Sequence, residues 1–378
     1  MNLFQVYSLL DLEPVKAQGA YLWDKQGVEY LDFYGGHAVI SIGHTHPHYV
    51  EKICDQLSKI GFYSNAVINS LQVELAQKLG ELSGYEDYEF FLCNSGAEAN
   101  ENALKLASFT TGRELVLAMK GAFHGRTSMA VAVTDNPKIQ APVNKSDKVS
   151  FVELNDVEAM RQELAKKEYA ALIIEPIQGV NGIRVASTEY LEAASAACKE
   201  YGTLLIMDEI QAGSGRSGRY FAHQWAGIRP DIITLAKGIA NGFPVGAVMI
   251  SPKIPAWKGM LGTTFGGSHL ACAAAIAVAD VMKSEELVKN AEKMGQAIVE
   301  GIKGTSGIKD IRGRGLMIGI DLSVPQVDFR RVLREKYHIM TGLSGEFTLR
   351  LLPPLMITQK EVDRFVEAFR QTAAELGM

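Results

Sequence analysis

The sequence predicts an α/β fold with a large domain, built on a mostly parallel sheet between helices, and a smaller α+β domain. From about residue 88 to residue 250, short apolar runs alternate with helical patterns, which is typical of strand and crossover-helix units around a parallel sheet. The runs are almost wholly apolar, as expected for strands buried on both faces. Outside this block the pattern changes to a hairpin, amphipathic helices and isolated strands, which indicates a second and smaller unit.

The large domain is expected to contain a series of short buried strands. The predicted strands are 89–93, 115–119, 171–174, 204–207, 231–234 and 246–250. Helices are expected between them at 99–108 and 187–201. The second helix has Ser187 at a plausible N-cap and ends before Gly202, which are favoured residues at those two positions.

The smaller domain is expected to combine both ends of the chain. Residues 20–33 have the pattern of a hairpin whose turn is Asp24-Lys25-Gln26-Gly27. The C-terminal part predicts an amphipathic helix around 284–303, strands at 316–320 and 348–352, and a final helix after Thr358. We therefore divide the chain into an N-terminal segment of the small domain (1–48), the large domain (49–265), and an interdomain helix with the C-terminal small domain (266–378).

Composition excludes several classes of partner. The 378 residues have a net charge of −5 and no long Lys/Arg run, so neither nucleic acid nor an anionic membrane is an expected partner. Four scattered cysteines contain no CxxC pair, which argues against a zinc or redox motif and favours the cytoplasm. No signal peptide and no apolar stretch of spanning length is evident. Small molecules are the expected partners.

The first candidate site residue is Asp208, which follows the apolar run 204–207. Ligands of open α/β sheets bind beyond the carboxyl ends of the strands, so Asp208 is expected to face a site. An apolar strand ending in Asp208-Glu209 also resembles the metal-binding acid of a nucleotidase. That alternative requires a Gly-x-x-x-x-Gly-Lys-Ser/Thr loop, which the sequence lacks.

The second candidate is Lys237, which lies just after the run 231–234 and before Gly238. Most lysines in such positions are solvated. Burial, however, disfavours the charged form and would make Lys237 a Schiff-base nucleophile. An acid that keeps a pyridine nitrogen protonated and an amine that binds the aldehyde are what pyridoxal 5′-phosphate (PLP) needs. Asp208 and Lys237 at successive strand ends therefore predict a PLP enzyme.

A strand-to-helix junction at Ser95-Gly96-Ala97 could bind the phosphate of such a cofactor. Free backbone N–H groups and the positive end of the helix dipole would meet an anion there. A plain N-cap by Ser95 explains the same residues. The absence of a Walker lysine suits a phosphate that is held and never transferred.

A further stretch, 121–127, places an aromatic ring, an imidazole and a guanidinium just beyond a predicted strand. Phe123 could stack on a flat ring, with His124 beside it, and Arg126 could bind a carboxylate in a bidentate manner. Core packing or a surface ion pair would account for these residues equally well.

Taken in chain order, these motifs resemble the class III (subgroup II) aminotransferases, and within them the acetylornithine/succinylornithine aminotransferase group. The resemblance covers nearly the whole chain and rests on residues 94–100, 123–126, 208–211 with Lys237, and 263–267. It implies the PLP-dependent transferase fold of type I.

The resemblance also implies how the cofactor is bound. The residues concerned are Ser95, Gly96, Ala97, Phe123, His124, Asp208, Gln211, Lys237 and Thr264. The first three would contact the phosphate, Phe123 would stack on the ring and Gln211 would bind its phenolic oxygen. Asp208 would bind the ring nitrogen, and Lys237 would carry the cofactor and transfer protons. Thr264 would reach the phosphate of the neighbouring subunit, which implies a homodimer with shared active sites.

Substrate residues follow from the same resemblance. Glu175 would act in catalysis by pairing with Arg350: the arginine would bind the α-carboxylate of glutamate when free, and Glu175 would neutralise it when the amine donor is bound. Each residue alone would also fit a structural salt bridge. Arg126 is expected to bind the carboxylate of the donor, and Thr263 is expected to contact substrate.

Three other features depart from this scheme or compete with it. Residues 43–48 contain three histidines that look like a metal cluster, but the resemblance gives them a structural role near the dimer interface, so no metal is expected. Ser268-His269 stands where relatives usually carry Asn-Pro. Val180-Asn181 stands where many relatives have a Gly-Glu-Gly-Gly type of loop. Both departures bear on fine specificity.

The expected activity is transfer of the δ-amino group of N-acetylornithine or N-succinylornithine to 2-oxoglutarate, giving the N-acylglutamate semialdehyde and glutamate in arginine biosynthesis. The short chain and the carboxylate partner Arg126 favour an acylornithine donor over ornithine or 4-aminobutyrate. A PLP-dependent racemase or aminomutase of the same fold, or a non-catalytic PLP-binding protein, remains an alternative. The sequence leaves open the acyl group, assembly beyond a dimer, and a role in arginine synthesis, arginine breakdown or lysine synthesis.

Overall fold

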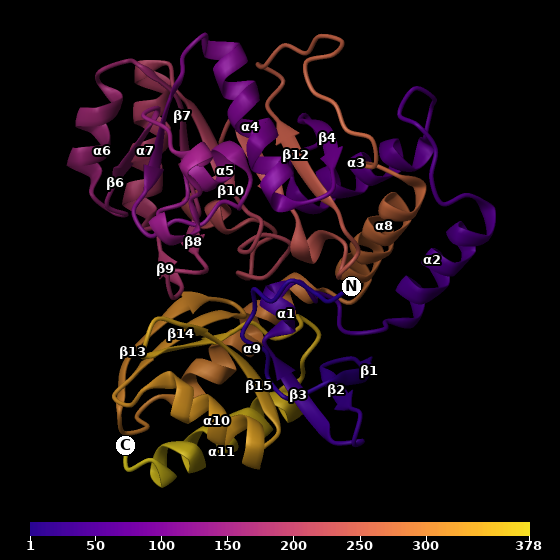
Figure 1. The fold of residues 1–378 in the computed structure, drawn as a ribbon, viewed down its shortest axis with the longest axis vertical. Helices are drawn as coiled ribbons and strands as arrows, with labels where there is room; N and C mark the ends of the chain where they lie inside the picture. Colours follow the sequence, from indigo (N-terminus) through magenta and orange to yellow (C-terminus); the bar gives the residue numbers. More distant parts are fainter.

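The computed structural model describes residues 1–378 and has two lobes, each built on a seven-stranded sheet (Figure 1). The strands of the large lobe follow one another in space as β4 (Glu89–Cys93), β12 (Gly246–Ile250), β11 (Ile232–Leu235), β10 (Leu204–Asp208), β7 (Tyr169–Ile174), β5 (Leu115–Met119) and β6 (Val149–Val152). Only β12 runs antiparallel to its neighbours. The prediction of a mostly parallel sheet is therefore confirmed.

Helices cover both faces of this sheet, which is why its central strands are apolar at successive positions. Helix α4 (Gly96–Thr111) packs against Ala171, Ile173 and their neighbours. Helices α6 (Val157–Leu164) and α7 (Thr188–Tyr201) pack against Leu172 and Ile174 on the opposite face. Each strand thus presents alternate side chains to two cores.

Local capping sets the helix ends. Ser187 accepts a hydrogen bond from the Tyr190 N–H, and Gly202 ends α7 in the left-handed conformation, both as predicted. Helix α4 is longer than the predicted 99–108, because the Ser95 side chain caps it and so allows it to begin at Gly96.

The small lobe joins the two ends of the chain in one sheet. Its strand order is β1 (Pro14–Gln18), β2 (Tyr21–Asp24), β3 (Glu29–Phe33), β15 (Ile339–Ser344), β16 (Thr348–Leu351), β14 (Met317–Leu322) and β13 (Ile308–Arg314). Strands β2 and β3 form the predicted antiparallel hairpin. Parallel pairing of β3 with β15 connects the N-terminal strands to the C-terminal ones.

The remaining elements complete the layers and connect the lobes. Helices α9 (Leu287–Ile302), α10 (Gln326–Lys336) and α11 (Gln359–Glu375) contribute to the core of the small lobe. Helix α8 (His269–Ser284) lies beside α2 (Pro47–Lys59) and α3 (Ser70–Ser83) and leads from the large lobe to the small one (Figure 1). Short elements are α1 (Gly35–Ala38), α5 (Ser128–Ala132), β8 (Ile177–Gln178), β9 (Arg184–Val185) and the 3-10 turns Pro137–Ile139, Pro142–Asn144, Ala222–Ala226 and Lys237–Ile239. None of the helices has the length and apolar character that crossing a membrane requires.

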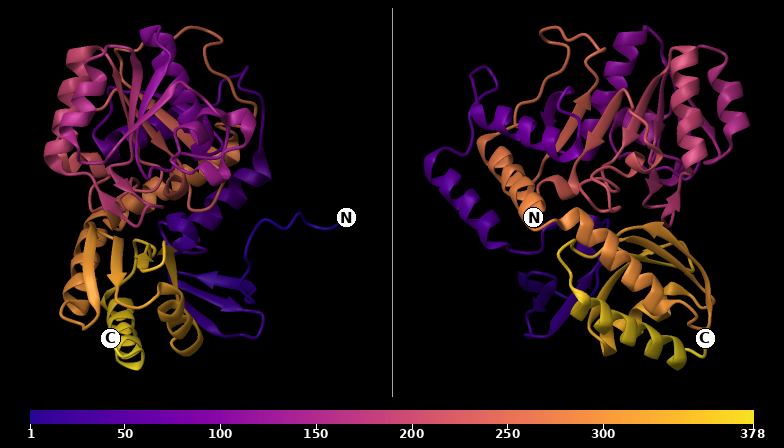
Figure 2. Two further views of the ribbon diagram at one scale, coloured as in Figure 1. Left: turned by 60° about the vertical axis from the view of Figure 1, so that its left-hand side comes forward. Right: turned by 180° about the vertical axis from the view of Figure 1, so that it is seen from behind.

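The buried guanidinium of Arg216 connects the lobes. Its Nη1 donates to the carbonyl oxygens of Leu316 (3.0 Å) and Pro353 (2.7 Å), and its Nη2 donates to that of Ile40 (3.3 Å). Leu316 and Pro353 flank strands of the small lobe, so the small lobe is held against the edge where β7, β10 and β11 end. Figure 2 shows this edge of the large lobe facing the small lobe in both views.

Candidate active site

A cavity of about 290 Å³ lies at the carboxyl ends of the large-lobe strands. Loops that follow β4, β5, β7, β10 and β11 all contribute to its wall. The lining residues are Gly96, Ala97, Phe123, His124, Gly125, Arg126, Glu175, Val180, Asp208, Ile210, Gln211, Ala236 and Lys237. Most of the residues that the sequence singled out for cofactor and substrate binding therefore meet in one place.

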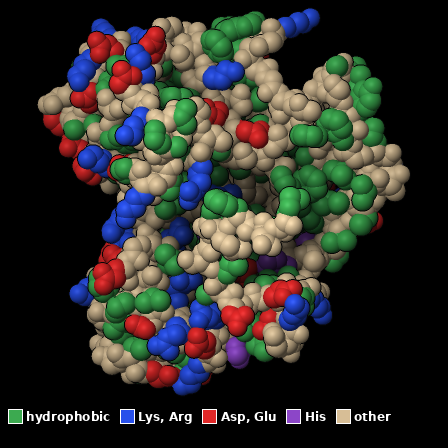
Figure 3. Space-filling model, in the orientation of Figure 1, with side chains coloured by type: hydrophobic (Ala, Val, Ile, Leu, Met, Phe, Trp, Pro, Cys, Tyr) green, Lys and Arg blue, Asp and Glu red, His purple; other side chains and the backbone are tan.

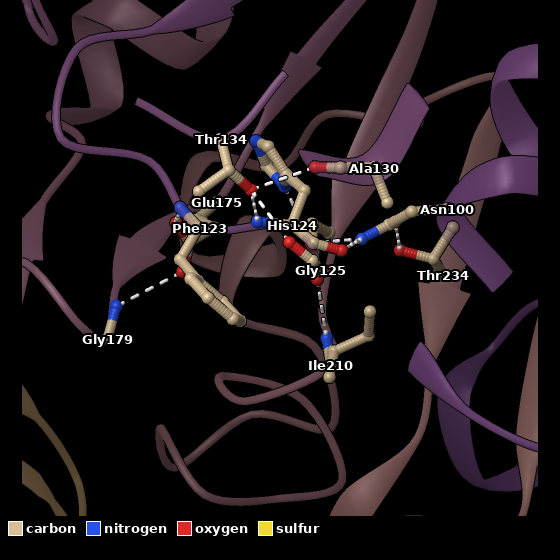
Figure 4. Close-up of polar contacts among 11 residues, drawn as sticks. Asn100, Phe123, His124, Gly125, Ala130, Thr134, Glu175, Gly179, Ile210 and Thr234 are labelled. Atoms are coloured by element: carbon tan, nitrogen blue, oxygen red, sulfur yellow. Dashed lines mark hydrogen bonds and ion pairs between the residues drawn. The ribbon is translucent and has the colours of Figure 1, made fainter. Parts of the chain in front are cut away.

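Asp208 ends β10 and is held by three N–H donors. Its Oδ2 accepts hydrogen bonds from Asn100 Nδ2 (2.8 Å) and His124 Nδ1 (2.7 Å), and its Oδ1 accepts one from the Ile210 N–H (3.1 Å). Figure 4 shows the three donor residues, Asn100, His124 and Ile210, which belong to three different segments of the chain. The carboxylate is buried, so its orientation is set by these donors.

Lys237 begins the 3-10 turn that follows β11. Its φ of 50° lies in the left-handed region, which residues other than glycine seldom adopt. Burial lowers the pKa of the Lys237 ammonium, while the negative charges of Asp208 and Glu175 act in the opposite direction. The net effect favours the neutral, nucleophilic amine.

The N-terminus of α4 is suited to binding an anion. Ser95 Oγ accepts a hydrogen bond from the Glu98 N–H (3.2 Å), so the N-cap interpretation of Ser95 is correct. Gly96 and Ala97, in the first turn, line the cavity, and the N–H groups of a first turn have no partner within the helix. Gly125 has a φ of 144°, and a Cβ there would lie 2.8 Å from the Ala97 Cβ, so only glycine lets the 123–126 loop approach the helix so closely.

Glu175 is buried and bound to backbone. Its Oε1 accepts a hydrogen bond from the Phe123 N–H (2.8 Å), and its Oε2 accepts one from the Gly179 N–H (3.1 Å). Burial raises the pKa of this carboxyl, with a smaller contribution from the charge of Asp208. Glu175 thus holds the loops after β5 and β7 together.

Glu175 and Arg350 do not form an ion pair here; their pairing was expected when the amine donor is bound, and it stays a prediction. Arg350 Nη1 donates instead to the Gly179 carbonyl oxygen (2.7 Å), and the buried Nε has no partner. Each oxygen of Glu175 accepts one backbone N–H hydrogen bond and keeps a lone pair for a further partner. Arg350 is buried, and its one side-chain hydrogen bond is to the Gly179 carbonyl oxygen.

Gln211 also carries an unpartnered atom. Its Nε2 donates to the His37 carbonyl oxygen (3.3 Å), while its buried Oε1 has no hydrogen bond. A Cβ on Gly179 would lie 1.8 Å from this Oε1, so glycine at 179 is required for Gln211 to occupy its position. Gln211 Oε1 and the equally unpartnered His124 Nε2 belong to residues of the cavity wall. Buried polar atoms of this kind indicate a missing polar ligand.

Thr263 and Thr264 lie away from this cavity within the single chain. Thr263 Oγ1 accepts hydrogen bonds from Asn94 Nδ2 (3.3 Å) and the Gly266 N–H (3.1 Å). Thr264 is exposed on the loop that precedes α8. The expected contact of Thr263 with substrate is therefore not seen in its own subunit, whereas the exposure of Thr264 is compatible with a role in a neighbour's site.

The three histidines of the 43–48 segment do not converge. His44 Nε2 lies 2.8 Å from Asp32 Oδ2, His46 Nε2 lies 3.0 Å from Glu285 Oε1, and His48 Nε2 lies 3.2 Å from Asp280 Oδ2. Each imidazole thus contacts a different carboxylate. The structure contains no group of three or more His, Cys, Asp or Glu side chains arranged to bind a metal.

Sequence reasoning missed Asn100 and Thr234, which are fully buried beside Asp208. Thr234 Oγ1 donates to Asn100 Oδ1 (2.8 Å), and Asn100 contacts Asp208 directly. One signal was available: Asn100 is a polar residue on the face of α4 that is otherwise formed by Ala99, Ala103 and Ala107. A buried amide there needs hydrogen-bond partners.

Comparison with known proteins agrees with this geometry. The family model described as aminotransferase class-III matches residues 5–373. The acetylornithine aminotransferase of Archaeoglobus fulgidus is 39% identical over 369 residues (97% of this chain, 96% of the relative), and that of Bacillus subtilis is 39% identical over 379 residues (99% and 98%). The crystal structure of the ornithine aminotransferase from Toxoplasma gondii superposes with a TM-score of 0.92 at 29% identity, covering 99% of this chain and 93% of that one.

The lowered pKa of Lys237 predicts a specific pH dependence. The neutral amine increases as pH rises through the pKa, so a lower pKa makes Lys237 reactive at a pH where ordinary lysines are still protonated. We expect covalent uptake of PLP by the apoprotein to rise with pH to a midpoint below 10.5. Lys237→Ala is the control and should show no covalent uptake. A midpoint at or above the ordinary lysine value would contradict the assignment.

Proposed function

The chain belongs to the class III aminotransferase family, and on that premise we propose that it transfers the δ-amino group of an N-acylated ornithine to 2-oxoglutarate. The protein is a PLP-dependent transaminase, as are the enzymes of this family. The products would be the N-acylglutamate semialdehyde and glutamate. N-acetylornithine is the first candidate donor, because relatives that are 39% identical over nearly the full chain are acetylornithine aminotransferases. N-succinylornithine is the second.

The observation that carries the proposal is the convergence of Asp208 and Lys237 on one cavity from the ends of adjacent parallel strands. The cavity fits PLP in its chemistry: an acid for the ring nitrogen, an amine for the aldehyde, an unpartnered Gln211 Oε1 and a helix N-terminus for the phosphate. Phe123 forms a wall of the same cavity and would stack on the ring. When bound, PLP supplies an electron sink that makes a C–H bond beside the reacting nitrogen acidic.

The chain's own groups would orient the reactants and move protons. Asp208 would use a lone pair of Oδ1, the oxygen with the single donor, to bind the ring nitrogen. Lys237 Nζ, once neutral, would accept a proton from the reacting carbon and donate it again, as base and then as acid. Its lowered pKa supports both roles, because a catalytic pKa near the working pH is the most effective.

Two arginines are proposed to bind the substrate carboxylates. Arg126 lines the cavity beside Phe123 and His124 and would bind the carboxylate of the donor. Arg350 would bind the α-carboxylate of 2-oxoglutarate and glutamate, since it is a buried cation with a free Nε and no acidic partner. The absence of an acidic partner means that Arg350 is available in the resting enzyme.

A panel of amine donors tests the activity. Acetylornithine, succinylornithine, ornithine, 4-aminobutyrate and acetyl-lysine are each supplied with 2-oxoglutarate, and glutamate formation is measured. We expect an acylornithine to have the highest kcat/KM. A higher kcat/KM with ornithine or 4-aminobutyrate would change the assigned donor and leave the transaminase assignment intact. If no donor yields glutamate, the proposed reaction is wrong.

Substitution of Arg350 tests the assignment of the carboxylates. Arg350→Ala should raise the KM for 2-oxoglutarate by about tenfold to a hundredfold, which corresponds to one charge-assisted hydrogen-bonded contact. The rate of the donor half-reaction should change much less. Arg350→Lys keeps the charge and lacks the planar guanidinium fork. Its KM for 2-oxoglutarate should therefore lie between those of the wild type and Arg350→Ala. Equal losses in both half-reactions would show that Arg350 does not discriminate between the substrates.

We propose a homodimer with shared active sites, and an exposed apolar surface supports it. Apolar side chains of α2, α3 and the segment between them are exposed, including Leu57, Tyr63, Val67, Ile68 and Val73. Figure 3 shows hydrophobic side chains gathered on this side of the molecule. A contiguous apolar surface of this kind is typical of a protein interface.

Mixing the Lys237→Ala and Thr264→Ala variants tests the dimer and the role of Thr264 together. In a mixed dimer of Lys237→Ala and Thr264→Ala subunits, one of the two sites would combine an intact Lys237 with an intact Thr264 from the neighbour. We therefore expect activity to reappear when the two variants are unfolded and refolded together. Each variant refolded alone serves as the control. Mixed samples no more active than these controls would refute site sharing through Thr264.

We also propose a compartment and a pathway for the protein. All four cysteines are free, which suits the reducing cytoplasm, and an acylornithine donor suits arginine biosynthesis. Growth of a strain that lacks this step on medium without arginine, restored by the gene for this chain, would support the pathway.

A further inference from the structure

The side chain of Asn100 lies at the junction of four elements around Asp208. It projects from the second turn of α4 and is completely buried. Its Nδ2 donates to Asp208 Oδ2 (2.8 Å) at the end of β10 and to the His124 carbonyl oxygen (2.7 Å) after β5. Its Oδ1 accepts a hydrogen bond from Thr234 Oγ1 (2.8 Å) on β11. Figure 4 shows these contacts around Asn100, with Thr234 on one side and His124 on the other.

The orientation of this amide is determined by its partners. A backbone carbonyl can only accept, so the NH₂ group of Asn100 must face the His124 oxygen. The amide oxygen is thereby turned toward Thr234, whose hydroxyl donates to it. All the hydrogen-bonding capacity of the NH₂ group is used, and the amide has no alternative orientation that keeps these bonds.

The same contacts fix the spacing between the acid and the lysine. Asp208 and Thr234 are direct partners in the parallel pairing of β10 with β11, and Lys237 comes three residues after Thr234. Asn100 bridges these two positions through a single side chain. Because Asn100 and His124 both bind Oδ2, Asp208 retains a free lone pair on Oδ1, whose only donor is the Ile210 N–H.

We propose that Asn100, held by Thr234, is a positioning residue that determines which oxygen of Asp208 faces the cofactor ring and how far that oxygen lies from Lys237. The proposal deepens the assigned transaminase chemistry and rests on PLP occupying this cavity. It assigns Asn100 no contact with substrate. The competing interpretation is that Asn100 only ties α4 to the sheet and contributes stability.

Two substitutions separate these interpretations. Asn100→Ala removes both donors to Asp208 and His124, and Thr234→Val removes the hydroxyl that orients the amide while keeping the side-chain shape. Asn102→Ala is the matched control, because Asn102 lies on the same helix and its side chain donates only to the Glu98 carbonyl oxygen. Thr234→Ser, which keeps the hydroxyl, is the rescue variant.

Measurements without any amine donor make the test independent of the proposed substrate. In Asn100→Ala the Asp208 carboxylate would be oriented less well and would stabilise the positive charge on the ring less. A weaker positive charge on the ring favours protonation at the Lys237 nitrogen. The pH midpoint of the coenzyme absorbance should therefore rise by roughly one unit in Asn100→Ala. Thr234→Val should shift it in the same direction by less. Asn102→Ala and Thr234→Ser should retain the wild-type midpoint. These shifts are expected whichever donor the enzyme uses.

Turnover gives the second readout. At saturating PLP, kcat of Asn100→Ala should fall by about tenfold to a hundredfold, the size of effect that a misplacement of about 1 Å produces, with KM values nearly unchanged. Variants that lose thermal stability but keep the wild-type pH midpoint and kcat would overturn the proposal and leave Asn100 a structural tie. Should Asn100→Ala fail to fold, an unchanged midpoint and kcat in Thr234→Val would overturn it equally.

Discussion

The hydrogen bonds to the Asp208 carboxylate are the constraint on which the arrangement of the active site depends. A buried carboxylate is costly unless donors surround it, and here the donors come from α4, from the loop after β5 and from its own turn. Each donor can reach Asp208 only if its element begins or ends at the same edge of the sheet. Satisfying one charge therefore places the phosphate-binding helix end and the Phe123–Arg126 loop around one cavity.

Lys237 depends on the same edge of the sheet. The parallel pairing of β10 with β11 sets the two residues at neighbouring strand ends, and the small lobe, joined to the large one through Arg216, lies against that edge. Burial then lowers the lysine pKa, while the nearby acids limit the shift. Reactivity of the amine is thus a consequence of where the strand ends and what covers it.

Local patterns were sufficient to predict what depends on local interactions. The central strands, the caps of α7 and the positions of Asp208 and Lys237 at strand ends follow from apolar runs and capping residues, and the structure has them. The sequence predicted that both ends of the chain share the small domain, but it did not show that β3 pairs with β15, because the paired residues lie about 300 positions apart. The contacts that Glu175 and Arg350 make here could not be read either, because the backbone groups that bind them belong to loops whose folding the sequence does not show. Asn100 was overlooked because its partners lie on three other elements.

The central claim is that Asp208 keeps the ring nitrogen of a Lys237-bound cofactor protonated. Nuclear magnetic resonance of the protein loaded with PLP labelled with ¹⁵N in the ring measures that proton directly. The account predicts a protonated-pyridine signal in the wild type and a neutral-pyridine signal in Asp208→Asn. A neutral-pyridine signal in the wild type, with the cofactor bound to Lys237, would contradict it.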